Sequence, residues 1–287
     1  MDTDTQVKQQ VRAFYDQIGW QEQSDGFYQN ASHEDLRPVS REYIHKCHQR
    51  VLRYLNSSGR LLLDAGCGPI QYPEYLEYSQ GYSYRVCADI SLIALQEARK
   101  RIGRHGLYVV CDVAYLPFKP DVFDGEVSLH TLHHLPPEEH VRAYQELHRT
   151  LTKRGKAVIV NGWDNPPLSV FVNILIGLKN RLYAVYHPHS KSLELNLANN
   201  LSAEPINMRD TYVYKESAAW LQKEVGSLMP IKIWCWRSVS VYYLRNIIHE
   251  RLAGKALLKL LFWKEELFPH FLGKYGQYPL VELSKSK

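Results

Sequence analysis

Three aspartates stand at matching places in the chain, each directly after an apolar run. Asp64 follows the run LLL, Asp89 closes the run YRVCA and Asp112 follows the run LYVVC. If these runs are neighbouring parallel strands, their carboxyl ends meet at one edge of a sheet and bring the three carboxylates to one crevice. Three carboxylates would repel a pyrophosphate. They suit a ligand that carries hydroxyl and amino donors and a positive charge.

Two glycines follow the first of these aspartates, in the stretch LLLDAGCGPI at residues 61–70. A strand that turns at once through glycines lets the backbone approach a ligand closely. The dinucleotide pattern G-x-G-x-x-G is incomplete, because Gln71 stands where the third glycine would be. The nucleoside triphosphate pattern G-x-x-x-x-G-K-[ST] is absent from the sequence. An NAD or nucleotide-sugar enzyme on a similar sheet is therefore disfavoured.

The elements that must position these groups alternate between strand and helix. We expect strands at residues 60–63, 84–88, 107–111, 122–129 and 156–160. Ser91 is expected to cap the helix that follows the second strand, and Gly103 to end it. Ser40 is expected to cap a helix that precedes the first strand. Continuous apolar strands separated by helices predict a doubly wound α/β fold, with a parallel sheet covered on both faces.

In this order and spacing, the motifs resemble the class I S-adenosylmethionine-dependent methyltransferases, in the branch called type 11. Asp64-Ala-Gly-Cys-Gly resembles the first motif of that family, in which the glycines let the backbone approach the methionine part of the cofactor. Asp89, 25 residues further on, stands where the family has the acid that accepts both ribose hydroxyls. Asp112 and Val113 resemble the pair that reads the adenine edge, and Leu129 resembles the strand end that lines the sulfonium.

The resemblance implies S-adenosylmethionine as the cofactor and a Rossmann-like, mostly parallel seven-stranded sheet with an antiparallel last strand. The residues it assigns to the cofactor are Asp64, Ala65, Gly66, Cys67, Gly68, Asp89, Ile90, Asp112, Val113, Leu129 and His130, and the N-terminal helix adds Tyr15. Ile70 stands where many members have a third glycine, which leaves the shape of the loop open. Each aspartate alone could simply cap a helix or a turn; their joint occurrence favours the cofactor.

Candidate bases follow the fourth and fifth strands. His130, His133 and His134 lie in LHTLHHLPP, and Asp164 lies in NGWDNPP. Methyl transfer needs alignment and exclusion of water, and it needs a base only where the acceptor must lose a proton. We expect His134 to be the base for a hydroxyl acceptor, with the other three groups as alternatives or as groups that orient it. O-methylation is expected first, C- or N-methylation is the alternative, and a non-catalytic module that binds the cofactor is the alternative of another class.

The segments around the core divide the chain into four parts. They are an N-terminal helical cap (1–58), the cofactor-binding core (59–164), a helical insertion (165–215) and the end of the sheet (216–287), with a second insertion at about 240–275. In the second insertion, Arg251, Lys255 and Lys259 form a basic stripe beside a wide apolar face. Such a helix either roofs an apolar acceptor pocket, which we favour for both insertions, or lies on a membrane surface. Both interpretations predict a hydrophobic or amphipathic small-molecule acceptor, such as a lipid, quinone, glycolipid or secondary metabolite.

Composition bounds the location and the partners. The five cysteines are odd in number and include no C-x-x-C pair, and the N-terminus is not a signal peptide, so we expect a cytoplasmic protein that also has the option of peripheral contact with a membrane. The first 150 residues carry 16 Lys and Arg against 20 Asp and Glu, whereas the remainder carries 19 against 10. Aromatic and basic residues are not interleaved in this basic half, so we expect no nucleic-acid partner. No metal is expected, since His187 and His189 lack a third ligand nearby.

Overall fold

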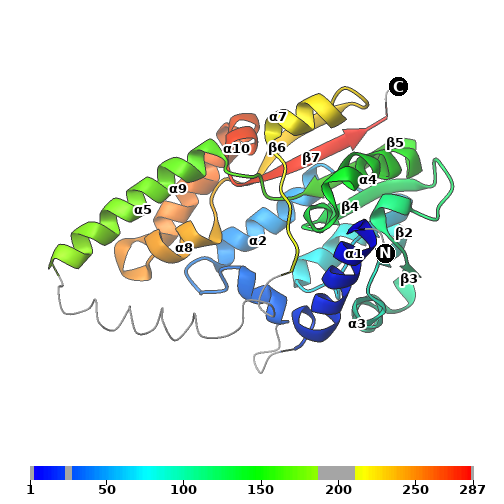
Figure 1. Cartoon of the computed structure of the whole chain (residues 1–287), viewed down its shortest axis with the longest axis horizontal. Helices are drawn as coiled ribbons and strands as arrows, with labels where there is room; N and C mark the ends of the chain where they lie inside the picture. Colours follow the sequence, from blue (N-terminus) through cyan, green and yellow to red (C-terminus); the bar gives the residue numbers. More distant parts are fainter. Residues whose placement is uncertain (1–2, 23–27, 187–210, 286–287) are drawn as a thin grey trace.

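A seven-stranded sheet forms the centre of the computed structural model, which describes residues 3–22, 28–186 and 211–285 (Figure 1). Its strands are β1 (Gly59–Ala65), β2 (Tyr82–Asp89), β3 (Gly106–Val110), β4 (Phe123–Leu129), β5 (Leu151–Val160), β6 (Ile231–Arg237) and β7 (Tyr278–Ser284). The order in the sheet is β3-β2-β1-β4-β5-β7-β6. β7 is antiparallel to both of its neighbours and the other pairs are parallel. The predicted fold class is confirmed.

Alternate residues of the central strands face two separate apolar cores. Leu62 and Leu63 are both fully buried, but they belong to different clusters because successive side chains of a strand point to opposite faces. The cluster around Leu62 includes residues of α2 (Arg41–Gln49), α3 (Leu92–Ile102), α8 (Val241–Ile247) and α9 (Gly254–Leu267). The cluster around Leu63 includes residues of α4 (Pro137–Thr150) and of the turn that follows α7 (Ala218–Trp220). Apolar side chains on both faces explain why the strands are apolar without interruption.

The two predicted helix caps turn out differently. Ser91 caps α3 as expected, since its Oγ accepts a hydrogen bond from the backbone N of Ala94 at 3.0 Å. Ser40 precedes α2, but its side chain makes no capping bond and its hydroxyl instead donates to Asp35 Oδ2 at 2.6 Å. The prediction of a Ser40 cap was wrong because a buried carboxylate nearby competes for the hydroxyl.

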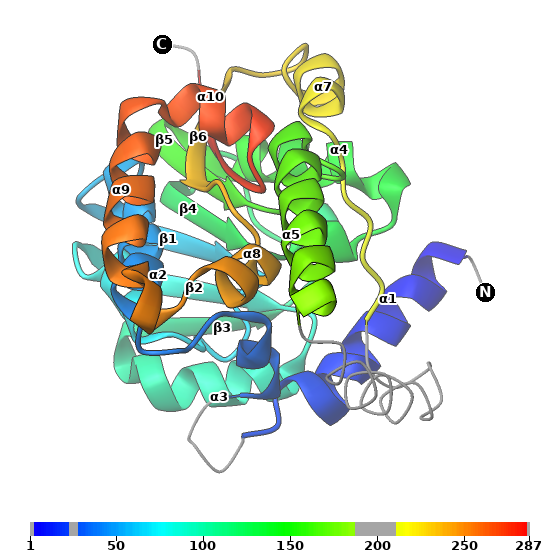
Figure 2. The ribbon, with the colours of Figure 1, turned by 90° about the vertical axis from the view of Figure 1, so that its left-hand side faces the viewer.

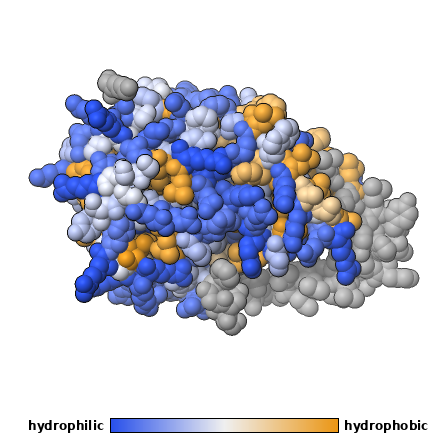
Figure 3. Space-filling view, turned by 180° about the vertical axis from the view of Figure 1, so that it is seen from behind, coloured by the Kyte–Doolittle hydropathy of each residue, from blue (hydrophilic) through white to orange (hydrophobic). Residues whose placement is uncertain are grey.

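The insertions lie on the outside of the sheet layers. α5 (Pro167–Tyr186), α9 and α10 (Pro269–Tyr275) lie on one side of the molecule in Figure 2. Apolar side chains at least half exposed on these helices include Phe171, Ile174, Trp263 and Phe271. Seen from behind, the surface is mainly hydrophilic, with small apolar patches in several places (Figure 3). In the described part of the chain, none of the helices has the length and apolar character that crossing a membrane requires.

Candidate functional site

A cavity of about 590 Å³ lies at the carboxyl ends of the central strands, beside α1 (Thr3–Phe14) and the turn that follows it. Most of the predicted site residues line it: Tyr15, Gly66, Cys67, Gly68, Asp89, Ile90, Asp112, Val113, Leu129, His130, His133 and His134. These residues come from five separate segments of the chain. The end of a doubly wound sheet brings them together, as expected for a parallel sheet.

Two glycines, Gly66 and Gly68, line the cavity directly after the end of β1. Gly66 has φ +74° and Gly68 has φ +52°, a region that side-chain-bearing residues rarely adopt. A Cβ on Gly66 would lie 2.2 Å from the side chain of Thr131, and a Cβ on Gly68 would lie 3.1 Å from the ring of Trp20. Neighbouring side chains thus leave no room for a Cβ at either position, and both glycines line the cavity where the methionine part of the expected cofactor would lie.

Ile70 takes the conformation that a glycine would adopt at lower cost. Its φ is +57°, and its side chain is fully buried in the cluster around Leu62. The backbone O of Ile70 also accepts a hydrogen bond from Arg101 Nη1 at 2.7 Å. Burial of the side chain and this hydrogen bond offset the strain of the left-handed backbone, which is of order 1–2 kcal/mol. The loop thus keeps a left-handed turn without the third glycine.

Asp89 presents free acceptor positions to the cavity. Its Oδ2 accepts the backbone N–H of Gly68 at 2.9 Å and its Oδ1 accepts that of Ser91 at 2.8 Å. A carboxylate has about four lone-pair sites, so about two remain for a pair of hydroxyl donors. Burial raises the pKa of Asp89 to about 6. The geometry fits a ribose whose two hydroxyls donate to this carboxylate.

Asp112 lies at the far side of the cavity and is tied to α1. Its Oδ1 accepts the backbone N–H of Ala114 at 2.8 Å, while Oδ2 contacts Lys8 Nζ. Lys8 also bonds Glu139 at 2.7 Å. Burial lowers the pKa of Lys8, but the hydrogen bonds to Asp112 and Glu139 outweigh it and the pKa rises. Lys8 thereby fastens the N-terminal helix over the cavity.

Three predicted site residues do not line the cavity. Asp64 is buried and forms a salt bridge with Arg85 of the neighbouring strand, whose Nε lies 3.0 Å from Asp64 Oδ2. Ala65 is buried beside it. Asp164 is exposed at the surface, where its Oδ1 accepts a hydrogen bond from Asn165. Asp64 therefore stabilises the sheet, and Asp164 is not positioned to act as a base or to orient one.

His134 and Tyr15 form a hydrogen-bonded pair in the cavity wall. Tyr15 Oη lies 2.7 Å from His134 Nε2, and His134 Nδ1 lies 2.7 Å from the carbonyl O of Tyr212. A carbonyl can only accept, so Nδ1 carries the proton and Nε2 accepts from the Tyr15 hydroxyl. Burial lowers the pKa of His134 to about 4, so the ring is neutral near pH 7. Burial also raises the pKa of Tyr15.

The other two histidines are neutral as well. His133 Nδ1 lies 3.1 Å from Asn161 Oδ1, and an amide oxygen accepts, so Nδ1 is the donor. His130 has φ +56°, and burial lowers its pKa to about 3. Both rings lie in the cavity wall. Among the described residues, His134 is the one histidine of the three whose ring bonds the hydroxyl of another residue that lines the cavity, Tyr15.

The opposite half of the cavity was not predicted from the sequence. Its lining residues are Asn30, His33, Glu34, Gln71, Tyr72, Tyr75, Trp236, Arg237 and Tyr278. Tyrosines in QYPEYLEY, directly after the glycine motif, were a local signal for part of this wall. Glu34 and Arg237 form a buried ion pair across 203 positions, which no local pattern could reveal.

The expected lid differs from the structure. Among the described residues, Thr211, Val213 and Lys215 are the members of the first insertion that reach the cavity, and α5 and the second insertion contribute none. α9 packs on α2 and β6 instead, and its Trp263 is 58% exposed. The second insertion therefore does not roof the cavity, because the apolar stripe of α9 faces outward. His187 and His189 lie outside the described residues.

Comparison with known proteins identifies the core. Residues 63–159 match the family model described as a methyltransferase domain. The tRNA (carboxymethyluridine(34)-5-O)-methyltransferase alkbh8 of Xenopus tropicalis is 28% identical over 143 residues, which cover 42% of this chain and 21% of that protein. The probable tRNA methyltransferase 9B of Bos taurus is 27% identical over 130 residues, which cover 44% of this chain and 27% of that protein. The chain thus spans about a quarter of the length of these relatives.

A solved structure supports the fold over nearly the whole chain. Phosphoethanolamine N-methyltransferase 1 of Haemonchus contortus, in complex with phosphoethanolamine and S-adenosylhomocysteine, has a TM-score of 0.59 at 9% identity and covers 99% of this chain and 50% of that chain. At this identity the likeness shows the fold alone. The expectation of no nucleic-acid partner is contradicted, because curated relatives of the core are named tRNA methyltransferases. The basic second half of the chain carries no argument against nucleic acid.

Proposed function

Residues 63–159 form a class I methyltransferase domain with S-adenosylmethionine as its cofactor, and we propose that the chain methylates an oxygen of a flat, polar-edged small molecule. The observation that carries the proposal is the hydrogen-bonded chain from Tyr15 through His134 to the carbonyl of Tyr212. When bound, the cofactor supplies a methyl group already activated by the sulfonium. The chain's own residues then have to hold the acceptor, exclude water and take up a proton.

Tyr15 and His134 can take up that proton together. An acceptor hydroxyl that donates to Tyr15 Oη would pass its proton to that oxygen while Tyr15 passes its own proton to His134 Nε2. The carbonyl of Tyr212 fixes the tautomer in which Nε2 is free to accept, and burial keeps the ring unprotonated near pH 7. General base catalysis of this kind contributes about 10²–10⁴-fold to a rate.

We place the acceptor in the opposite half of the cavity, which we call the acceptor half, and its walls favour a flat ring over a lipid tail. Tyr72, Tyr75, Trp236 and Tyr278 line this half with aromatic side chains, and the apolar helices α5 and α9 do not line the cavity. Aromatic rings stack best on other flat rings. This preference narrows the amphipathic acceptors expected from the sequence to ring compounds.

Transfer of tritium from methyl-labelled S-adenosylmethionine tests the proposal. Purified chain is incubated with a small-molecule cell extract and with total tRNA, and the label is followed into each fraction and then through alkaline hydrolysis. Label in a small molecule, as an alkali-stable methyl ether, is expected. Tyr15→Phe and His134→Gln should lower this rate by about 10²–10⁴-fold, while the cofactor Kd stays within about threefold. Binding of cofactor without label in any fraction would refute the proposal and leave a non-catalytic module.

A second candidate is methylation of a tRNA nucleoside. It is favoured by the curated relatives, one of which is named for transfer to an oxygen of carboxymethyluridine. In this case the nucleoside would have to leave its stack to enter the cavity. Label in the tRNA fraction alone would establish this candidate and exclude the free small molecule.

A further inference from the structure

The acceptor half of the cavity holds an unusual buried ion pair between Glu34 and Arg237. Both side chains line the cavity, with Glu34 7% and Arg237 2% exposed. Arg237 Nη1 bonds Glu34 Oε1. Burial opposes ionisation of Glu34, but the charge of Arg237 outweighs it and lowers the pKa of the carboxyl. The two groups are therefore charged, and the pair is neutral as a whole.

The pair is not satisfied by the protein alone. Arg237 Nε is buried and has no hydrogen-bond partner in the described part of the chain. The indole Nε1 of Trp236, which also lines the cavity, is buried without a partner in the same sense. Burying a guanidinium N–H without an acceptor costs desolvation free energy, so an unpaired N–H at this position indicates that a bound molecule supplies the acceptor.

The carboxylate keeps an open acceptor next to these donors. The two hydrogen bonds that reach Glu34 from described residues, from Arg237 Nη1 and from the backbone N of Asp35 at 2.9 Å, both end on Oε1. Oε2 is thus left for another donor. Side by side, the pair offers N–H donors on Arg237 and an oxygen acceptor on Glu34.

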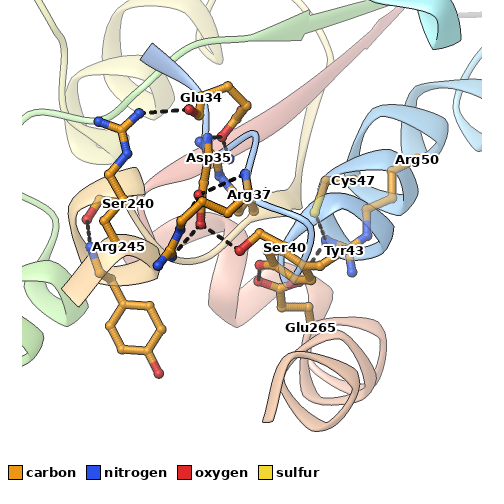
Figure 4. A network of polar contacts seen from close by, with 12 residues as sticks. Glu34, Asp35, Arg37, Ser40, Tyr43, Cys47, Arg50, Ser240, Arg245 and Glu265 are labelled. Carbon is orange, nitrogen blue, oxygen red and sulfur yellow. Dashed lines mark hydrogen bonds and ion pairs between the residues drawn. The ribbon is translucent and has the colours of Figure 1, made fainter. Parts of the chain in front are cut away.

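Surrounding contacts hold the Arg237 side chain and the backbone of Glu34 in place. The guanidinium carbon of Arg237 lies 4.6 Å from the ring centroid of Tyr278 and 5.1 Å from that of Trp236. Arg245 Nη2 donates to the backbone O of Glu34 at 2.8 Å, as Figure 4 shows. The next residue, Asp35, is tied to its own network, in which it accepts from Arg37 and Ser40 (Figure 4).

We infer that this pair reads the edge of the acceptor, and that the acceptor is a planar ring whose edge carries a carbonyl oxygen beside an N–H group. The carbonyl would accept from Arg237, and the N–H would donate to Glu34 Oε2. A neutral pair of donor and acceptor complements such an edge better than it complements a bare anion, because an anion would face the carboxylate of Glu34. This inference rests on the proposed function.

The test measures binding to the full chain loaded with S-adenosylhomocysteine, so that no methyl transfer is needed. Titration calorimetry compares 2-quinolone, which has the carbonyl beside an N–H, with N-methyl-2-quinolone, which lacks the N–H, and with quinoline, which lacks the carbonyl. We expect 2-quinolone to bind at least tenfold more tightly than either analogue. Equal binding of the three, or binding of none, would overturn the inference.

Variants test separately the carbonyl contact with Arg237 and the N–H contact with Glu34. Arg237→Gln should weaken 2-quinolone at least tenfold, and Glu34→Gln should shrink the gap between 2-quinolone and its N-methyl analogue. The matched control is Arg50→Gln, since Arg50 is also 2% exposed and ion-paired, with Glu265, but does not line the cavity. An equal loss in Arg50→Gln would mean that any buried arginine has this effect, and would overturn the inference. The double variant Glu34→Gln/Arg237→Gln leaves no unpaired charge and tests the same loss if the single variant unfolds.

Competition distinguishes the two sources of such an edge. Total tRNA displaces 2-quinolone if the ring is a nucleobase presented by RNA, and fails to displace it if the ring is a free heterocycle. Either result is compatible with an acceptor ring whose edge carries a carbonyl oxygen beside an N–H group. The inference and the proposed function can also fail separately. Methyl transfer that survives Arg237→Gln with unchanged KM would overturn the edge assignment and leave the enzyme in place.

Discussion

The pH dependence of cofactor binding is the sharpest prediction, because it depends on Asp89 alone. Burial raises the pKa of this carboxyl to about 6 in the free protein. If the two ribose hydroxyls need the ionised form, the binding-competent fraction is about 0.9 at pH 7 and about 0.1 at pH 5. The Kd for S-adenosylhomocysteine should therefore rise about tenfold between pH 7 and pH 5, and stay nearly constant from pH 7 to pH 8.

The same pKa fixes the sign of the effect on stability. The folded value of about 6 lies above the usual value of about 3.9 for an unfolded aspartate. Asp89 therefore contributes stability to the free protein that is complete below about pH 4 and is lost as the pH rises through about 6. The contribution is about 3 kcal/mol. Cofactor binding and stability thus respond to Asp89 in opposite directions.

Calorimetry from pH 5 to pH 8 checks the binding curve, and Asp89→Asn is its control. The variant cannot ionise, so its Kd should be about 100-fold weaker at pH 7 through loss of charge-assisted hydrogen bonds, and its pH dependence should be flat. A flat curve for the unmodified chain would refute the ribose assignment. A tenfold slope that persists in Asp89→Asn would move the titration to another group.

Two further predictions separate the cofactor cradle from the sheet. Gly66→Ala should abolish detectable cofactor binding, because its Cβ would meet Thr131 at 2.2 Å and the backbone has φ +74°; a Kd within threefold of the original would contradict the cradle. Asp64→Asn should lower the free energy of unfolding by about 3–5 kcal/mol, since it leaves Arg85 buried without a counter-charge. Urea titration measures the stability of this variant, and calorimetry on the folded variant should give a cofactor Kd within about threefold of the original. A loss of affinity without a loss of stability would show that Asp64 contacts the cofactor.

The sequence predicted what depends on local pattern. Apolar runs gave strands in the right order, and the carboxyl end of a parallel sheet had to bring Asp89 and Asp112 together whatever the details of packing. Asp64 lies at the end of a strand as they do, but its partner Arg85 lies on the adjacent strand, where it is opposite Leu62, two positions before Asp64. Which way a strand-end carboxylate points depends on that partner, and a single sequence does not contain the pairing.

Contacts between distant segments were beyond the sequence. The Tyr15–His134 hydrogen bond spans 119 positions, and each residue alone was recognisable only as a candidate. Glu34 and Arg237 were missed altogether because a charged residue in an ordinary run reads as a surface residue. Asp164 shows the reverse case, a residue that the sequence placed in the site and that the structure places at the surface. It stood after the right strand, but the turn that follows carries its side chain to the surface.

The position of β7 between β5 and β6 has a consequence for how the chain is made. Until residues 278–284 leave the ribosome, β5 can pair on one side only and β6 has no neighbour in the sheet. The nascent chain therefore carries an unpaired strand edge through the synthesis of all the intervening helices, which is a hazard for aggregation. Tyr278, at the start of the same strand, also closes the cavity beside Trp236 and Arg237. This wall of the cavity, where we propose that the acceptor binds, is therefore complete only when the last strand has been inserted.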